Sequence, residues 1–146
     1  MSTMMVLIRI VAGIRYEIRG AEYKTNEPVI FAAKHQSAWD VIAFKVLAPD
    51  CAYVLKRELF WIPLWGWYVW RCGMVGVDRN GGGAALKTMV KTAVEILKTG
   101  RPIVLFPQGT RTPTGAQRPY LPGVAALYMG AGVPVVPVAL NSGTFW

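Results

Sequence analysis

The sequence predicts a single α/β domain with a mixed, mostly parallel sheet flanked by helices, and three observations predict it. Its 146 residues fit one domain. Short apolar runs of strand length recur along it, and helical patterns separate them. The expected buried strands are 28–33, 52–55, 102–106 and 133–140. Alternating strands and helices are typical of parallel sheets covered by helices.

Helices are expected where apolar residues repeat at helical spacing. The clearest spans residues 84–98, where apolar positions form one stripe and lysines lie off it. A second follows Ser37 over residues 38–47 and stops before Pro49, and a third spans 123–129 and ends at Gly130. Residues 107–122 are expected to form a loop. Residues 59–70 hold Pro63 and Gly66, which make one long regular helix unfavourable there.

The N-terminal segment is apolar but short. Residues 4–14 are interrupted by Arg9, and no run in the chain reaches the roughly 20 apolar residues that cross a bilayer. We therefore divide the chain into residues 1–18, an interfacial helix or a truncated membrane anchor, and residues 19–146, the main domain. The main domain is either complete or lacks residues at its C-terminus. An ordinary core helix is the alternative for the N-terminal segment.

Composition narrows the class of partner. The net charge is +8, yet 53% of residues are hydrophobic and only 16% are charged. Basic residues are spread along the chain instead of forming the stripe typical of nucleic-acid binders. This combination favours an anionic membrane surface over nucleic acid. Two cysteines, Cys51 and Cys72, predict a reducing compartment and no disulfide framework.

The segment KHQSAWD, residues 34–40, follows a predicted strand and opens a predicted helix. It holds His35, the one histidine of the chain, and Asp40. A carboxylate that binds one ring nitrogen leaves the other free to act as a general base. The alternative is structural, because Ser37 to Asp40 has the spacing of a helix capping box.

The segment FPQGTRT, residues 106–112, follows another predicted strand. Gly109 permits a turn with exposed amides, Thr110 offers a hydroxyl, and Arg111 offers a planar donor pair that suits phosphate. A surface turn with a solvated arginine is the alternative. Asp78 and Arg79 form a third polar cluster, which either binds substrate or pairs with surface charges.

Residues 59–70, which we call the aromatic segment, have three interpretations. Its four tryptophans, with Phe60 and Tyr68 beside them, lie at the headgroup level of a membrane, line an acyl-chain groove, or pack in the core. The tryptophans are Trp61, Trp65, Trp67 and Trp70. Four are more than one small core accommodates, which favours partial lipid contact. Lys56, Arg57 and Arg71 suit anionic headgroups.

Taken together and in this order, the clusters resemble the glycerol-phosphate and lysophosphatidic acid acyltransferase family. KHQSAWD is similar to its asparagine-His-Gln-Ser-x-x-Asp block, and residues 56–79 to a block ending in Asp-Arg. FPQGTRT resembles its Phe-Pro-Glu-Gly-Thr-Arg block, and VPVVPVAL its proline-punctuated strand. Lys34 and Gln108 depart from the usual asparagine and glutamate. Residues 19–146 are thus identified with its acyltransferase domain.

The resemblance implies transfer of an acyl group from acyl-CoA or acyl-carrier protein to lysophosphatidic acid, giving phosphatidic acid. It implies His35 as base and Asp40 as the residue that orients it, with no metal or bound cofactor. The residues that it implies bind substrate are Arg79, Gln108, Gly109, Thr110 and Arg111. It implies membrane association at a cytoplasmic face. Another lyso-lipid acceptor, which Gln108 favours, and a non-catalytic lipid-binding fragment remain alternatives.

Overall fold

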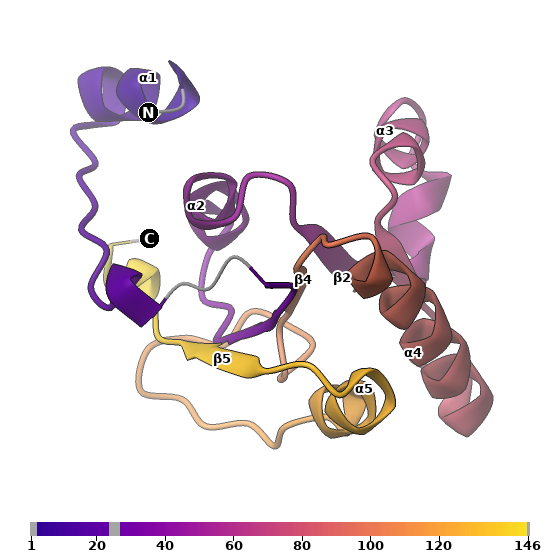
Figure 1. Cartoon of the computed structure of the whole chain (residues 1–146). Helices are drawn as coiled ribbons and strands as arrows, with labels where there is room; N and C mark the ends of the chain where they lie inside the picture. The colour runs from indigo at the N-terminus through magenta and orange to yellow at the C-terminus, as the bar shows by residue number, and fades with distance from the viewer. Residues whose placement is uncertain (1–2, 24–26, 146) are drawn as a thin grey trace.

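The computed structural model describes residues 3–23 and 27–145, which contain a five-stranded sheet (Figure 1). The strands are β1 (Ile30–Ala33), β2 (Ala52–Lys56), β3 (Val75–Val77), β4 (Ile103–Leu105) and β5 (Val135–Val138). Their order is β3-β2-β4-β1-β5, and every described strand pair is parallel. The expected α/β domain with a mostly parallel sheet is therefore confirmed, and no antiparallel pair occurs among the described strands. Strand β3 was not predicted, because three residues are too few to show a pattern.

The helices are α1 (Thr3–Ala12), α2 (Trp39–Leu47), α3 (Trp65–Arg71), α4 (Gly82–Lys98) and α5 (Gly123–Ala131). Helices α1, α2, α4 and α5 agree with the sequence pattern apart from their ends, whereas α3 was not predicted. Three short 3-10 helices are η1 (Ala21–Tyr23), η2 (Arg57–Trp61) and η3 (Ser142–Thr144). The aromatic segment breaks into η2 and α3 around Pro63, which confirms that it forms no single long helix.

Helices cover both faces of the sheet, so there are two hydrophobic cores. Strand β1 shows how they arise: Phe31 and Ala33 face one core and Ile30 faces the other, as strand alternation requires. Phe44 of α2 joins the core of Phe31. Met89 of α4 and Leu127 of α5 join the core of Ile30. Figure 1 shows α2 apart from the adjacent pair α4 and α5.

Helix α1 exposes most of its apolar side chains whose burial is described. Met5 is buried, whereas Leu7, Ile10 and Val11 are exposed. Among the described residues, no helix combines the length and hydropathy needed to cross a bilayer. The boundary between residues 18 and 19 remains a prediction.

The tight contact between η2 and α3 depends on Gly66. A Cβ atom placed on Gly66 would lie 1.9 Å from the carbonyl oxygen of Phe60. The Gly66 amide also donates a 2.6 Å hydrogen bond to the carbonyl of Ile62. Only glycine therefore lets the two short helices approach this closely.

We expect Gly66→Ala to lower the free energy of unfolding by about 1–3 kcal/mol, because the added methyl overlaps the Phe60 backbone. Urea unfolding followed by circular dichroism measures this change. Gly83→Ala is the matched control, since a Cβ there meets nothing within 4 Å. The control is expected to be neutral or to stabilise by up to about 1 kcal/mol. Equal stability of the two variants would contradict the close approach at Gly66.

Candidate active site

Two loops at the carboxyl edge of the sheet bring the predicted polar residues together. The strands β1 and β4 are parallel neighbours, so the segments that follow them emerge side by side. From β1 the chain passes to β2, and from β4 it passes in the opposite direction to β5. Ligands of open α/β sheets bind in the crevice outside the carboxyl ends of the strands, where neighbouring strands connect in opposite directions. This topology places the KHQSAWD and FPQGTRT segments at one site.

His35 is held at the start of the first loop. Its Nδ1 lies 2.9 Å from Oδ2 of Asp40, and its side chain is 17% exposed. The imidazole stacks on the ring of Phe106 at a centroid distance of 4.2 Å and an interplanar angle of 21°. Among residues 3–23 and 27–145, nothing hydrogen-bonds to Nε2. The ring is thus fixed from two sides, and its second nitrogen is available for proton transfer.

Asp40 is fully buried, and its carboxylate collects hydrogen bonds from several directions. Oδ2 accepts the backbone N–H groups of Gln36 at 2.6 Å and Ser37 at 2.9 Å, in addition to the contact with His35. Oδ1 accepts the hydroxyls of Ser37 at 3.3 Å and Ser142 at 2.5 Å. A buried carboxylate needs such partners because it has lost its hydration.

These contacts decide the charge of Asp40. Burial raises the pKa of a carboxyl group, but hydrogen bonds from His35, Ser142 and two backbone amides outweigh it. The pKa of Asp40 falls from an ordinary 3.8 to about 2. The side chain is therefore ionised near neutral pH and can hold the imidazole in one orientation.

The structural interpretation of this segment is also partly correct. Ser37 Oγ accepts the backbone N–H of Trp39 at 3.2 Å, and Asp40 accepts the N–H of Ser37, much as a capping box does. The residue that precedes α2 is nevertheless Ala38, not Ser37. Asp40 thus stabilises the start of α2 with the same oxygen that contacts His35. The two interpretations describe one arrangement.

Sequence reasoning missed Ser142, which lies 102 positions after Asp40. It stands on η3, and the next residue, Gly143, donates its N–H to Oε1 of Gln36 at 3.2 Å. The C-terminal turn therefore closes over the His35 loop. No local pattern marks a lone serine for this position, because only the fold brings it to the carboxylate.

The second loop joins the first through its backbone. The N–H of Thr112, a buried residue, donates to the carbonyl of His35 at 2.8 Å. Gly109 has a φ of +67°, and a Cβ on it would lie 3.6 Å from Cζ of Arg79 and 2.7 Å from Leu121. The structure therefore brings Arg79, after β3, to the Gly109 turn, after β4. Thr110 and Arg111 are exposed beside this turn.

Gln108 and Lys34, the two departures from the family pattern, have different surroundings. Gln108 is 8% exposed, and its buried Oε1 has no hydrogen-bond partner among the described residues. Lys34 donates from Nζ to the carbonyl of Ala116 at 3.1 Å, which fastens the middle of the 107–122 loop. Lys34 is thus structural here, whereas Gln108 retains an unused acceptor.

Asp78 has a local role. Its Oδ1 accepts the N–H of Asn80 at 2.9 Å, which forms the turn between β3 and α4. Of the Asp78–Arg79 cluster, Arg79 is the residue that lies near the Gly109 turn.

A groove of about 1180 Å³ lies next to the His35–Asp40 pair. It runs between residues 12–20, α2 and β5, and chain neighbours of the pair, such as Trp39, and Ser142 itself line it. Most of its other side chains are apolar, among them Ile14, Phe31 and Leu140. Within the described part of the chain, no three His, Cys, Asp or Glu side chains cluster closely enough to hold a metal ion.

Comparison with known proteins gives concordant matches. Residues 15–141 match the family model described as Acyltransferase. A 1-acyl-sn-glycerol-3-phosphate acyltransferase of Pseudomonas aeruginosa is 40% identical over 140 residues, which are 96% of this chain and 54% of that protein. The human 1-acyl-sn-glycerol-3-phosphate acyltransferase alpha is 33% identical and covers 95% of this chain and 50% of its own length.

A solved structure agrees with these matches. The crystal structure of the 1-acyl-sn-glycerophosphate acyltransferase PlsC from Thermotoga maritima superposes with a TM-score of 0.64 at 29% identity. The match covers 82% of this chain and 47% of that protein. The chain thus spans about half the length of the proteins it resembles.

The depressed pKa of Asp40 has a consequence for stability. Its folded pKa of about 2 lies below the ordinary 3.8. The stabilisation is therefore complete above about pH 4 and is lost as the pH falls towards 2. We expect Asp40→Asn to lower the free energy of unfolding by roughly 2 kcal/mol at pH 7, and this difference to shrink below pH 4.

Urea unfolding from pH 7 to pH 2 measures this difference. Asp50→Asn is the control, since the Asp50 side chain is 81% exposed, and it should change little across the range. A difference between parent and Asp40→Asn that stays constant down to pH 2 would disprove the ionised, hydrogen-bonded carboxylate.

Proposed function

The chain belongs to the acyltransferase family, and on that premise we propose that it transfers a fatty acyl group to 1-acylglycerol-3-phosphate, giving phosphatidic acid. The acyl donor is acyl-CoA or acyl-carrier protein. One observation carries the proposal: an oriented His35–Asp40 pair lies next to a glycine turn flanked by Arg79 and Arg111. The pair supplies a base, and the turn supplies donors for a phosphate.

The proposed reaction is a direct transfer. Nε2 of His35 takes the proton from the free hydroxyl of the acceptor while that oxygen bonds to the thioester carbonyl carbon. The carbon–sulfur bond then breaks, and the leaving thiolate takes a proton from the imidazolium. Asp40 stays ionised throughout and stabilises the transient positive charge of His35. Neither a metal nor a bound cofactor enters this scheme, since the thioester is already activated.

Acceptor binding is proposed at the Gly109 turn. Arg79 and Arg111 are exposed side chains whose planar donor groups suit a phosphate, and the Thr110 hydroxyl adds a donor. The free Oε1 of Gln108 is a buried acceptor for a hydroxyl or amine of the lipid. These four groups surround a turn that the Thr112 amide connects to His35. Such an arrangement would bring a bound acceptor close to the base.

We place the proposed reaction at a membrane surface, because both the acceptor and the product are lipids. The apolar groove beside Asp40 has the lining to receive one acyl chain. The net charge of +8 favours an anionic surface, such as the cytoplasmic face of a membrane. No interaction with nucleic acid is part of this proposal.

His35→Ala is expected to lower acceptor-dependent thiol release from acyl-CoA by a factor of about 100 to 10,000, because the general base is lost. Purified protein in detergent with lysophosphatidic acid provides the assay. Asp40→Asn should fall between parent and His35→Ala. Met129→Ser, at an exposed position of α5, is the control and should retain parental turnover. Near-parental release by folded His35→Ala would refute the base. An unreactive parent that still binds lipid would favour the non-catalytic alternative.

Arg111→Ala is expected to raise the KM for lysophosphatidic acid by about tenfold or more with little change in kcat, because a charged phosphate contact is lost. Arg111→Lys should recover part of the affinity through its charge. Arg118→Ala is a matched control, since Arg118 is exposed on the same loop. An unchanged acceptor KM in Arg111→Ala would exclude the phosphate contact.

A second acceptor class has one specific observation in its favour. Gln108 replaces the acidic residue of the family pattern and keeps an unpaired oxygen. A lyso-lipid with a donor group near its headgroup would satisfy that oxygen. Parallel assays with lysophosphatidic acid and with lyso-lipids that lack a phosphate monoester separate the two. A higher kcat/KM for the second group would replace the first proposal.

A further inference from the structure

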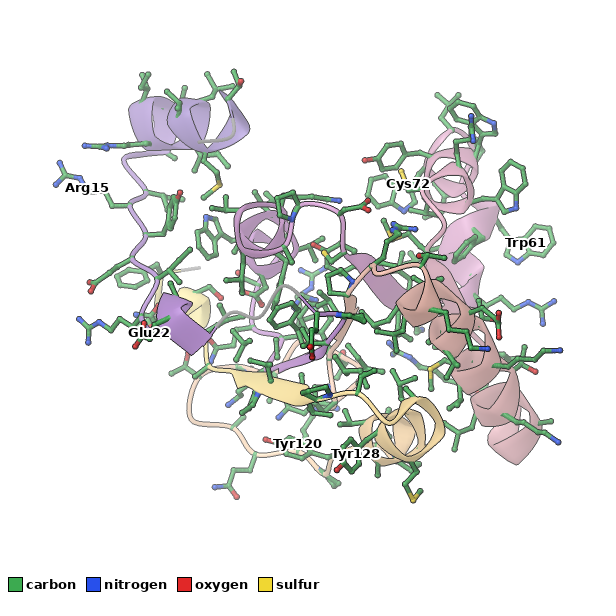
Figure 2. The ribbon with its side chains drawn as sticks, in the orientation of Figure 1. Arg15, Glu22, Trp61, Cys72, Tyr120 and Tyr128 are labelled. Carbon is green, nitrogen blue, oxygen red and sulfur yellow. The ribbon has the colours of Figure 1, made fainter. Side chains whose placement is uncertain are left out.

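Helix α3 and the neighbouring η2 form a surface that we call the aromatic hairpin, residues 57–71. Most of its large apolar side chains are exposed. Trp61 is 77% exposed, Trp67 66% and Trp70 68%, and Leu64, between the two helices, is 86% exposed. Figure 2 shows Trp61 projecting away from the domain. The proposed chemistry at His35 uses none of these residues.

Helix α3 distributes its apolar side chains in the opposite way to a typical helix of a soluble domain. Its buried positions are Gly66 and Val69, the two smallest side chains of the helix. The tryptophans occupy the outer positions instead. A helix that packs against a core normally turns its large apolar residues inward. The outward face therefore has a use outside the core, because large exposed apolar patches mark interaction sites.

The hairpin is held in this form by its backbone. Gly66 packs on the carbonyl of Phe60, and Leu64 has a φ of +62°, unfavourable for a bulky residue. Leu64 is the one residue other than glycine with positive φ in the described chain. Strain of this kind persists where the surrounding structure imposes it. It keeps Leu64 at the tip of the hairpin, in solvent.

The charges around the hairpin specify its partner. Lys56, Arg57 and Arg71 are exposed at its base, and Glu58 is the one acidic residue between positions 56 and 71. A tryptophan ring combines an apolar body with one N–H donor, which suits the boundary between lipid tails and headgroups. Basic residues beside such rings attract anionic headgroups.

We propose that the aromatic hairpin inserts Leu64 and its tryptophans into the headgroup layer of an anionic bilayer, with Arg57 and Arg71 on lipid phosphates. This inference deepens the proposed function, since a lipid acceptor must reach the site from a membrane. It assigns the docking to one structural element. Helix α1, which also exposes Leu7, Ile10 and Val11, stands at the upper left of Figure 1, whereas α3 stands at the upper right.

A second copy of the chain is a poorer occupant. Two copies meeting symmetrically through this surface would place Arg57 and Arg71 opposite like charges. An anionic bilayer satisfies the same charges.

The test is partition onto lipid vesicles, measured by co-sedimentation without acyl donor or acceptor. The vesicles contain phosphatidylcholine alone or with phosphatidylglycerol. We expect Trp61→Ser/Trp67→Ser/Trp70→Ser to lower partition at least about tenfold on both. Trp65 stays, because it contacts Tyr68 at a ring distance of 5.8 Å. Arg57→Gln/Arg71→Gln should lose about 25-fold on the anionic vesicles only.

Two matched controls separate this surface from general stickiness. Met129→Ser removes an exposed apolar residue of α5, and Lys87→Gln/Lys91→Gln removes two exposed charges of α4. Both should partition within about twofold of the parent, because Met129, Lys87 and Lys91 lie outside the aromatic hairpin. His35→Ala should also partition normally, which keeps this test independent of catalysis. Parental partition of the tryptophan variant, or an equal loss in the controls, would overturn the proposal.

A measurement on the unaltered chain covers the case in which the tryptophan variant does not fold. Four of the six tryptophans lie in the aromatic hairpin. Brominated phosphatidylcholine should therefore quench most of the tryptophan emission of vesicle-bound protein, and more strongly when bromine lies near the headgroups. Unquenched emission from bound protein would overturn the proposal. So would a lipid-free dimer that the tryptophan substitutions dissociate while partition stays unchanged.

Discussion

The buried carboxylate of Asp40 is the constraint on which the site depends. An ionised group without water is costly, so the fold must supply donors for both of its oxygens. They come from three places: the turn at Gln36 and Ser37, the imidazole of His35, and the hydroxyl of Ser142 near the C-terminus. Meeting this requirement fixes the His35 loop, the start of α2 and the C-terminal turn in one arrangement. The orientation of the His35 imidazole is thus a consequence of keeping a charge stable inside the domain.

The parallel sheet places a second loop beside this arrangement. Because β1 and β4 are neighbours, the loop that carries His35 lies against the loop that carries Gly109 and Arg111. The Thr112 amide then ties the second loop to the carbonyl of His35, and Lys34 fastens its outer part at Ala116. Lys34, which departs from the family pattern, therefore anchors this loop. Gln108, the second departure, has a buried Oε1 without a hydrogen-bond partner among the described residues.

The residues that form the hydrophobic cores and those that form the outward aromatic surface lie in different parts of the chain. The two cores consist of strand residues and the inner faces of α2, α4 and α5, and no tryptophan of the aromatic segment is buried in either. Helix α3 instead packs on the domain through its two smallest residues, Gly66 and Val69. Removing tryptophans from its outer face should therefore cost little folding energy. This separation allows the surface to be tested without dismantling the site.

The sequence by itself determined the α/β class, four of the five strands and the main helices, because apolar periodicity is a local signal. It also marked His35, Asp40 and the Gly109 turn, since chemically paired residues stand at short spacing beside predicted strand ends. Tertiary structure decided the rest. Strand β3 is too short to show a period, and the fully parallel order depends on which strands meet. Ser142 reaches the site from a distant position, and no local pattern encodes such a contact. The family resemblance pointed to Arg79, but only the fold brings it to the Gly109 turn. The outward direction of the tryptophans was likewise undecided until Gly66 was seen to occupy the inner face of α3.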